Sequence, residues 1–342
     1  MRIRRCRATL AACSSILCMA GTLWAQDISG SQSRNEGTHV RTQSEGVGAP
    51  EIIPHRNYQR LGGMPPAGST GTILPPISYH GGPVMGTPTV YLIWYGNWQQ
   101  TNNSDTADGQ QIIRDFLHGL SGSGYYATNT TYYDSSGNKP SGTFAVYSKE
   151  YTDNYSQGSP IPGQGATLAD RSVRNVVSRT ISIGALPKDT NGIYFVLTSS
   201  DVSETSGFCS RYCGWHTSGT ISGLNIKYSF VGNAFRCLNG CAAQSVGPNG
   251  NAGVDGMVSV LAHELEETNT DPNGNAWFDS KGAEDADKCA WTFGSNLSQA
   301  SNGAYYNLTL PIDINGHTRN YLVQRELDAG SLCFVDYSKE QQ

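Results

Sequence analysis

The feature that most constrains the fold is a helical pattern from Asn251 to Asp271. Its apolar residues recur at intervals of three, four and seven positions, which is the repeat of one helix face. These residues are Val254, Met257, Val258, Leu261 and Leu265. A helix with one apolar face must bury that face against another layer of structure. The sequence therefore predicts a helix that sits close beneath a sheet.

The same segment contains the residues "HELEE", which begin at His263. His263 and Glu267 are four positions apart, so their side chains lie one above the other on a helix. This spacing is typical of two ligands of one zinc ion in an H-E-x-x-H helix, here with Glu267 in place of the second histidine. Glu264 points about 100° around the helix axis, where a general base for a metal-bound water belongs. A solvated polar face with a His–Glu pair is the alternative interpretation.

Two acidic segments follow the helix. "DPNGNAWFD" offers Asp271, Asn273, Asn275 and Asp279 as oxygen ligands around Gly274, a pattern that predicts a calcium-binding loop. An Asx-rich turn without metal explains this segment about as well. "GAEDADKC" adds Glu284 and Asp287, either of which is a candidate for the third zinc ligand.

A further candidate is His216, in "CGWHTSG" next to Cys213. Its imidazole could supply a third metal ligand or donate a hydrogen bond to a reacting oxygen. A structural hydrogen bond within the fold is the other interpretation, and the sequence leaves both open.

The amino terminus is predicted to be a signal peptide, residues 1–25, cleaved near Ala25. Four arginines precede a short apolar run, and no second apolar run of about 20 residues follows. Residues 26–75 are polar and lack periodicity, so we expect a disordered leader or pro-segment, followed by a globular domain over 76–342. The protein is thus expected to be secreted, into the extracellular space or a periplasm, and not to insert into a membrane.

Net charge excludes one class of partner. Loss of the four signal-peptide arginines takes the formal charge from −5 to −9. An acidic chain without a basic cluster is a poor candidate for binding nucleic acid, but a reasonable one for binding cations. Nothing in the sequence predicts the oligomeric state.

Six of the nine cysteines remain after the predicted cleavage. An even number in an exported chain favours three disulfides, although Cys209, Cys213, Cys237 and Cys241 are also spaced for a zinc site. Fifteen connectivities of six cysteines are open. We favour bonds within each of the two closely spaced pairs, together with a bond between Cys289 and Cys333.

Strand and helix patterns alternate along the chain. Strands are expected at 89–96, 127–137, 142–151 and, as a buried central strand, 192–202; helices at 110–120 and 168–182; and a hairpin over 304–327 that turns at Asn315-Gly316. The predicted fold is a single α/β or α+β domain with a mixed sheet and about three helices, one of which is a zincin-like active-site helix.

Four blocks of sequence resemble the phosphate-induced protein 1 / EXORDIUM family of secreted proteins. They are "SYHGGPVMGTPTVYLIWYGNW", "YFVLTSSDV", "GFCSRYCGWH" and "GNAGVDGMVSVLAHEL". The resemblance runs in order from Tyr79 to Cys333. It implies an extracellular protein without a settled biochemical activity. The plant members lack a His-Glu pair at the position of "HELEE", so this chain resembles a bacterial branch of the family.

Two functions follow. The first is a secreted zinc-dependent hydrolase, a zincin-like metallopeptidase acting on protein or peptide, in which His263, Glu267 and Glu284 or Asp287 hold zinc and Glu264 and His216 act in catalysis. The second is a non-catalytic extracellular protein that binds cell-wall carbohydrate or another surface partner and contains structural calcium. In that case exposed aromatic rings could stack on sugars; the candidates are Trp94, Trp98, Tyr125 and Tyr126, although the preferred interpretation of most of them is a half-buried core position.

Overall fold

A computed structural model describes residues 51–54, 64–158, 160–161 and 165–340. All of these residues belong to one compact unit, Gly37–Gln342. The predicted signal peptide and most of the predicted leader lie outside the described residues. No helix in the described part of the chain is long and apolar enough to cross a membrane.

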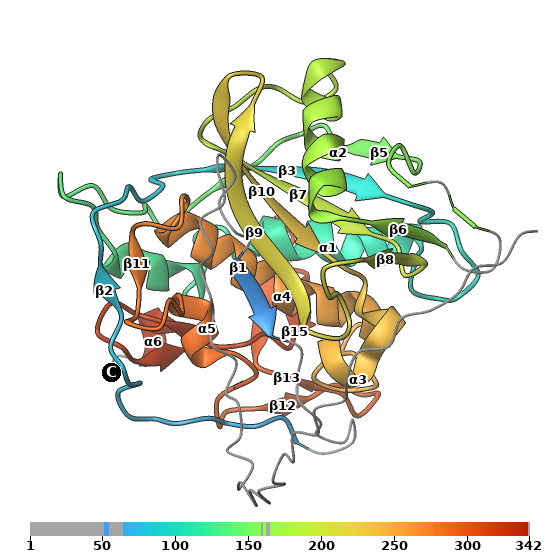
Figure 1. The fold of residues 1–342 in the computed structure, drawn as a ribbon. Helices are drawn as coiled ribbons and strands as arrows, with labels where there is room; N and C mark the ends of the chain where they lie inside the picture. Colours follow the sequence, from blue (N-terminus) through green and yellow to red (C-terminus); the bar gives the residue numbers. More distant parts are fainter. Residues whose placement is uncertain (1–50, 55–63, 159, 162–164, 341–342) are drawn as a thin grey trace, which may run out of the picture. The chain divides into compact units, whose positions relative to one another are not determined.

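The central sheet has seven strands and mixed direction (Figure 1). Its order is β1-β9-β10-β7-β3-β4, and β5 also pairs with β3. Strands β10, β7, β3, β4 and β5 run parallel, whereas β9 is antiparallel to β10 and β1 is antiparallel to β9. The bounds are β1 Glu51–Pro54, β3 Thr89–Tyr95, β4 Ala145–Val146, β5 Tyr151–Asp153, β7 Gly192–Thr198, β9 Tyr212–Ile221 and β10 Leu224–Val231. The mixed sheet is therefore as predicted.

The strands at the centre of the sheet are covered on both faces. Every residue of β7 is buried, and so is every residue of β3 after Thr89. Strands that are buried on both faces have continuous apolar sequences rich in β-branched and aromatic residues. The sequences of β3, "TVYLIWY", and β7, "GIYFVLT", are of this kind. The prediction of a buried central strand is confirmed.

The three predicted helices are present, together with several short ones. The long helices are α1 Ala107–Leu120, α2 Asp170–Ser182 and α4 Ala252–Thr270. The short ones are α3 Leu238–Cys241, α5 Asp285–Cys289, α6 Tyr337–Glu340 and the 3₁₀ helices η1 Tyr126–Thr131 and η2 Ala234–Cys237. Asn251 caps α4, because its side chain accepts a hydrogen bond from the backbone of Val254 at 3.1 Å.

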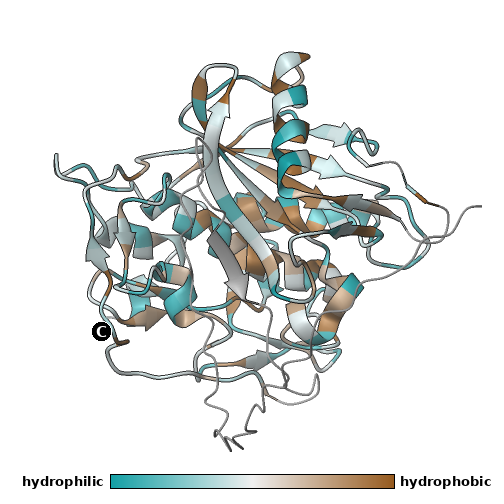
Figure 2. Ribbon diagram, in the orientation of Figure 1, coloured by the Kyte–Doolittle hydropathy of each residue, from teal (hydrophilic) through white to brown (hydrophobic). Residues whose placement is uncertain are grey.

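Helices α2 and α4 lie on opposite faces of the sheet (Figure 1). Helix α4 packs against β9 and β10 with α1 beside it, whereas α2 packs against β7 and β10. Along β9, Gly214 faces Val260 of α4 and Gly219 faces Arg174 of α2. These two glycines are five positions apart, so they must face opposite ways. In Figure 2, hydrophobic residues gather in the strands of the central sheet and in the helices beneath it.

The remaining strands form two-stranded sheets. The pairs are β2 Ser78–Tyr79 with β11 Trp277–Phe278, β6 Ala166–Leu168 with β8 Val202–Glu204, β12 Ser298–Gln299 with β13 Tyr305–Tyr306, β14 Leu308–Pro311 with β15 Thr318–Tyr321, and β16 Glu326–Leu327 with β17 Cys333–Phe334. The antiparallel pair β14–β15 is the predicted hairpin, and Gly316 in its loop has a φ of 86°.

Three predictions about local structure differ from the observed fold. Residues 127–137 do not form a strand: Tyr126–Thr131 is the 3₁₀ helix η1, and residues 132–137 are turn and irregular chain. Threonine side chains bond locally there: Thr128 donates to the carbonyl of Tyr125 at 2.9 Å and Thr130 to that of Ala127 at 2.7 Å. Such bonds favour a helical turn over a strand. Within the predicted leader, β1 pairs with β9 as an additional strand of the sheet. In 142–151 only β4 and the start of β5 are strands.

All six predicted cysteines form disulfides, but two pairings differ from the prediction. Cys289–Cys333 is confirmed, with Cα atoms 5.9 Å apart. The other bonds are Cys209–Cys237 and Cys213–Cys241, each joining residues 28 positions apart. They cross-link the start of β9 to the η2–α3 segment. Cys209 lies in the turn before β9, where its backbone N–H donates to the carbonyl of Tyr212 at 3.0 Å. The η2–α3 segment packs beside this turn and brings the Cα atoms of Cys237 and Cys241 to 5.6 and 5.4 Å from those of Cys209 and Cys213, within the range of a disulfide.

Candidate metal centre

Helix α4 has no solvated face. Every residue from Gly253 to Thr270 is buried. His263, Glu264 and Glu267 are each 0% exposed. The interpretation of "HELEE" as a solvated polar surface is therefore wrong, because the polar side of α4 packs against β9 and α5 instead.

Strand β9 brings His216 to this polar side. Gly214 and His216 are two positions apart on the strand, so they face the same way. A β-carbon on Gly214 would lie 2.5 Å from Val260 Cγ1 and 3.0 Å from Glu264 Oε1. Glycine at 214 thus permits the close approach of α4 to β9 that places His216 beside Glu264.

His216 contacts three carboxylates. Its Nδ1 lies 3.2 Å from Glu264 Oε2 and 3.4 Å from Glu267 Oε2. Its Nε2 lies 3.5 Å from Glu284 Oε2, at the amino end of α5. The side chain of His216 is 3% exposed, and those of Glu264 and Glu284 are 0% exposed. Both nitrogens of this ring therefore face buried carboxylate oxygens.

His263 faces a second set of oxygens. Its Nε2 lies 2.8 Å from Glu267 Oε1 and 3.6 Å from Asp287 Oδ1. The backbone N–H of Asp287 donates to Glu267 Oε1 at 3.1 Å. Helix α5, which contains Asp287, is anchored by the disulfide Cys289–Cys333. The hydrogen bond to Glu267 and the disulfide at Cys289 therefore fix the position of Asp287 beside His263.

Burial and charge act against each other in this cluster. Burial lowers the pKa of His216, but its contacts with the carboxylates of Glu264 and Glu267 outweigh it and raise the pKa to about 10. Burial and the charge of Glu267 raise the pKa of Glu264 to about 8. Burial also opposes ionisation of Glu267, yet the two histidines lower its pKa to about 2. The carboxylates therefore demand positive charge, which protons on the histidines or a metal ion can supply.

The donor atoms lie close enough to share metal ions. Among the described residues, one group of ligand atoms that lie within 4.8 Å of each other comes from His216, Glu264 and Glu267, and another from His263, Glu267 and Asp287. We refer to these five residues together with Glu284 as the metal centre. Imidazole nitrogen and carboxylate oxygen are ligands that zinc accepts. The predicted candidates His216, His263, Glu264, Glu267, Glu284 and Asp287 are thus brought together.

Asp271, Asn273 and Asp279 of the proposed calcium loop do not join this group. Asp271 Oδ1 accepts hydrogen bonds from the backbone of Asn275 and Ala276 at 2.6 and 2.7 Å. Asp279 accepts backbone N–H groups through Oδ1 and pairs with Lys288 through Oδ2. Asn273 accepts a hydrogen bond from Asn225 at 2.8 Å. The local backbone N–H bonds that Asp271 and Asp279 accept are those of an Asx-rich turn, the alternative interpretation of this segment.

The structure reveals a second buried group that the sequence did not predict. Glu266 of α4, Asp285 of α5 and Glu326 of β16 are each at most 1% exposed and influence one another electrostatically. Glu266 accepts a hydrogen bond from Asn129, Glu326 from Tyr125 and Asp285 from Thr270. We refer to Glu266, Asp285 and Glu326 as the acid cluster. The available sequence signal was Glu266 within "HELEE" and Asp285 within "GAEDADKC".

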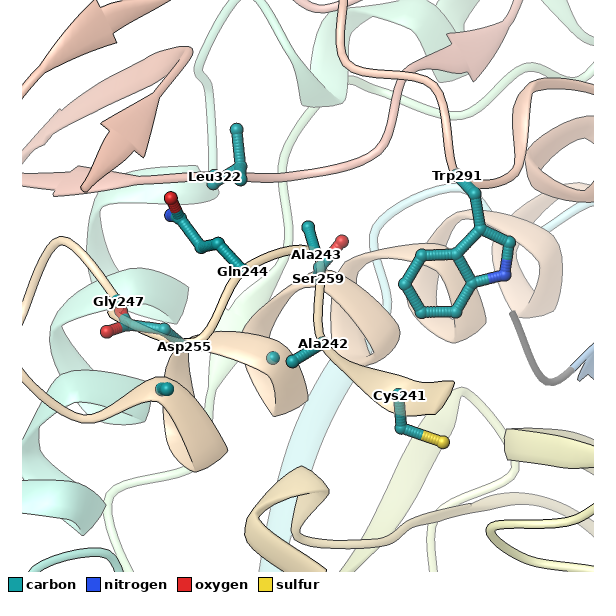
Figure 3. A pocket seen from close by; sticks show the side chains of 11 residues that line it. Cys241, Ala242, Ala243, Gln244, Gly247, Asp255, Ser259, Trp291 and Leu322 are labelled. Atoms are coloured by element: carbon teal, nitrogen blue, oxygen red, sulfur yellow. The ribbon is translucent and has the colours of Figure 1, made fainter. Parts of the chain in front are cut away.

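A small pocket lies near the amino-terminal half of α4 (Figure 3). Asp255 and Ser259 of α4 line it together with Gln244 and Trp291. Its volume of about 10 Å³ suits a single water molecule. Burial raises the pKa of Asp255 there to about 6. The pocket is lined by none of the residues of the metal centre.

Comparison with known proteins identifies relatives in plants. Protein EXORDIUM-like 3 of Arabidopsis thaliana is 31% identical over 287 residues, which cover 72% of this chain and 79% of the relative. Protein EXORDIUM-like 5 of the same plant is 32% identical over 252 residues, covering 64% of this chain and 65% of the relative. Protein PHOSPHATE-INDUCED 1 of Nicotiana tabacum is 29% identical over 272 residues, covering 68% and 80%. No solved structure matches the chain significantly.

The match to a protein family spans most of the domain. Residues 77–328 match the family described as "Phosphate-induced protein 1 conserved region". This stretch begins just before β2 and ends just after β16, so it includes the central sheet from β3 onward, α4 and the metal centre. The chain belongs to the phosphate-induced protein 1 family, whose relatives include the EXORDIUM-like proteins.

Proposed function

We propose that this protein is a non-catalytic, extracellular EXORDIUM-like protein in which the metal centre holds divalent zinc as a structural element. One observation carries the proposal: two histidines from different elements, β9 and α4, converge with carboxylates in a completely buried cluster. A buried group of carboxylates is costly unless cations compensate it. A metal bound to the folded state alone stabilises that state.

The donor atoms favour zinc over calcium. Calcium takes six to eight oxygen ligands in proteins, whereas zinc readily takes imidazole nitrogen and usually needs four ligands. His216 and His263 both present ring nitrogens to the carboxylates. Structural calcium, expected on the loop after α4, has less support because Asp271 and Asp279 are engaged by backbone N–H groups and Lys288.

The burial of the metal centre argues against a zinc-dependent hydrolase. A catalytic zinc ion keeps one position open for water and substrate. The side chains of His216, His263, Glu264, Glu267, Glu284 and Asp287 are 0–3% exposed. Glu264 lies 3.2 Å from His216, and is thus placed as a ligand or as a partner of a ligand rather than as a base facing a cleft. A peptide could not reach this group without a rearrangement of the domain.

Three disulfides support export. Disulfides persist in oxidising compartments such as the extracellular space or a periplasm. We also propose a surface partner such as cell-wall carbohydrate, but the four aromatic rings suggested by the sequence cannot bind it. Trp94, Trp98, Tyr125 and Tyr126 are at most 4% exposed, so they form part of the core and cannot stack on a sugar. Tyr133, 44% exposed, is a better placed ring.

Elemental analysis of the protein, purified without added metal, tests the proposal. We expect zinc in the wild type, a lower zinc content in His263→Ala, and an unchanged content in His118→Ala, which removes an exposed histidine of α1. A wild-type protein that contains no metal and takes up none from zinc solution would overturn the proposed metal centre. Peptide hydrolysis by the wild type that is lost in Glu264→Gln would overturn the non-catalytic assignment.

A further inference from the structure

Glu267 occupies a central position in the metal centre, because it belongs to both groups of potential ligands. Its Oε2 faces Nδ1 of His216 and its Oε1 faces Nε2 of His263. The two oxygens of one carboxylate therefore serve two different histidines. A single ion bound by both oxygens would have to pull both rings to one side of the carboxylate.

The distances between donor atoms fit two coordination shells. Zinc bonds of about 2.0–2.2 Å in a tetrahedral arrangement place neighbouring ligand atoms about 3.3–3.6 Å apart. In the first group, His216 Nδ1 lies 3.2 Å from Glu264 Oε2 and 3.4 Å from Glu267 Oε2. In the second, His263 Nε2 lies 2.8 Å from Glu267 Oε1 and 3.6 Å from Asp287 Oδ1. Three of these four separations lie in or close to that range, whereas the 2.8 Å between His263 Nε2 and Glu267 Oε1 is shorter. Each group can thus supply three ligand atoms of one tetrahedron after a small movement of the His263 ring.

Some potential ligand atoms of His263 and Glu267 lack a hydrogen-bond partner among the described residues. Although His263 and Glu267 are fully buried, the ring nitrogens of His263 and Oε2 of Glu267 make no hydrogen bond with any described residue. The contact of 2.8 Å between His263 Nε2 and Glu267 Oε1 thus lacks hydrogen-bond geometry. Buried polar atoms that lie close together without hydrogen-bond geometry are typical of ligands that share a cation.

The charges balance for two divalent ions. Glu264, Glu267, Glu284 and Asp287 contribute four negative charges when ionised. Two neutral histidines and two divalent ions then leave the buried group neutral, whereas one ion beside two neutral histidines leaves two charges that only protons could compensate. Glu284, 3.5 Å from His216 Nε2, is placed to orient that ring while Nδ1 faces the metal.

We propose that the metal centre is dinuclear, with Glu267 bridging two zinc ions. His216 and Glu264 complete one shell, and His263 and Asp287 complete the other. Bridged ions in proteins lie about 3.5–4 Å apart, a separation that the two oxygens of one carboxylate can span. The inference rests on the proposed metal centre, since it specifies how many ions that centre holds.

Stoichiometry separates the two proposals. The full mature chain is stripped with a chelator, loaded with Zn²⁺, freed of excess metal and analysed for zinc per chain. Two ions per chain support the dinuclear centre. One ion per chain overturns it and leaves the proposed metal centre intact, and no ion overturns both. His118→Ala, the surface control, should bind two ions like the wild type.

Single-ligand variants and cobalt sharpen the test. His216→Ala and His263→Ala should each retain about one ion per chain, because each removes a ligand of one shell only. Loss of both ions in both variants, with folding confirmed by circular dichroism, would overturn the assignment of separate shells. The wild type loaded with Co²⁺ needs no variant to fold: magnetic coupling between two ions is expected in its electron paramagnetic resonance spectrum. An uncoupled Co²⁺ signal at full loading would contradict the bridge.

Discussion

Two groups of buried carboxylates are neighbours at α4, and the free-energy cost of burying their charge is reduced in different ways. The metal centre has two histidines, and these hold the pKa of Glu267 at about 2. The acid cluster has no histidine. Burial, followed by the charge of Glu326, raises the pKa of Glu266 well above its usual value. Histidines thus favour the charged carboxylates in one group, whereas burial raises the pKa values of the other group and favours its protonated acids.

The hydrogen bonds of the acid cluster lower the pKa values of Glu266 and Glu326, but burial outweighs them. Glu266 and Glu326 are bonded by an amide and a phenol, from Asn129 and Tyr125, which are neutral groups. Neighbouring residues of one helix, Glu266 and Glu267, therefore belong to environments of opposite character. Type of residue and position in the chain do not explain the contrast, but the surrounding side chains do.

The largest expected effect comes from exchanging these two neighbours for glutamine. Glu267→Gln should lose metal binding and lower the free energy of unfolding by about 3–5 kcal/mol, because it leaves buried histidines and carboxylates uncompensated. Glu266→Gln should change that free energy by less than about 1 kcal/mol, since glutamine resembles a protonated glutamate. Urea denaturation at pH 7 measures both. Equal losses in the two variants would abolish the distinction between the two groups.

Chelation should produce the next largest effect, and only through the metal centre. Removal of zinc should lower the free energy of unfolding by about 3 kcal/mol when free zinc had been at 100 times its Kd. Glu266→Gln should respond to a chelator like the wild type, whereas Glu267→Gln should not respond. Thermal unfolding with and without chelator, followed by readdition of Zn²⁺, provides the measurement. A response of similar size in Glu267→Gln would place the metal elsewhere.

A smaller effect is expected from pH on the acid cluster. Burial and the charge of Glu267 raise the pKa of Asp285 to about 7. The folded state therefore retains a proton that the unfolded chain has already lost, and stability falls as the pH rises from about 4 to about 7. Asp285→Asn mimics the protonated acid, so it should gain about 2 kcal/mol over the wild type between pH 5 and pH 7.5.

Metal binding is itself pH-dependent, so this comparison requires protein treated with a chelator. Urea denaturation at several pH values gives the two profiles. Parallel profiles for Asp285→Asn and the wild type would show that Asp285 is ionised in the folded protein.

The smallest effect concerns the neutral partners of the acid cluster. The hydroxyl of Tyr125 donates to Glu326 Oε1 at 2.5 Å and also lies 3.0 Å from the carbonyl oxygen of Gln324. Tyr125→Phe should lower the free energy of unfolding by about 1–2 kcal/mol, since it leaves a buried acceptor without its donor. The exposed Tyr133→Phe serves as control and should lie within about 0.5 kcal/mol of the wild type. No difference between the two variants would argue that water replaces the hydroxyl.

Elements with a strong local pattern were predictable. The stripe that begins at Val254 identified α4, and "TVYLIWYG" identified β3. By contrast, the Thr- and Tyr-rich segment 127–137 has the composition of a strand but forms η1, because its threonines bond to nearby carbonyls. Composition was misleading there, since side-chain bonding within three residues outweighed the preference of β-branched residues for strands.

The candidate ligands were also accessible from the sequence, although their arrangement was not. The spacing of His263 and Glu267 follows from helix geometry alone. Glu284 and Asp287 were candidates because of their type, and His216 because of its neighbours. That His216 would face Glu264 depends on the packing of β9 against α4 at Gly214, which no local pattern encodes.

The sequence by itself determined the elements and the ligand types: a long helix with His263 and Glu267 on one side, a buried strand, six paired cysteines and a family. Only the tertiary structure decided that the polar side of α4 is buried, that Cys209 and Cys213 bond across to the η2–α3 segment, and that Glu266 and Glu267 enter different environments. The physical reason is the distance along the chain over which each effect acts. Periodicity and spacing act within a single element, whereas burial, disulfide pairing and pKa depend on segments tens of residues apart that meet only when the sheet and helices pack.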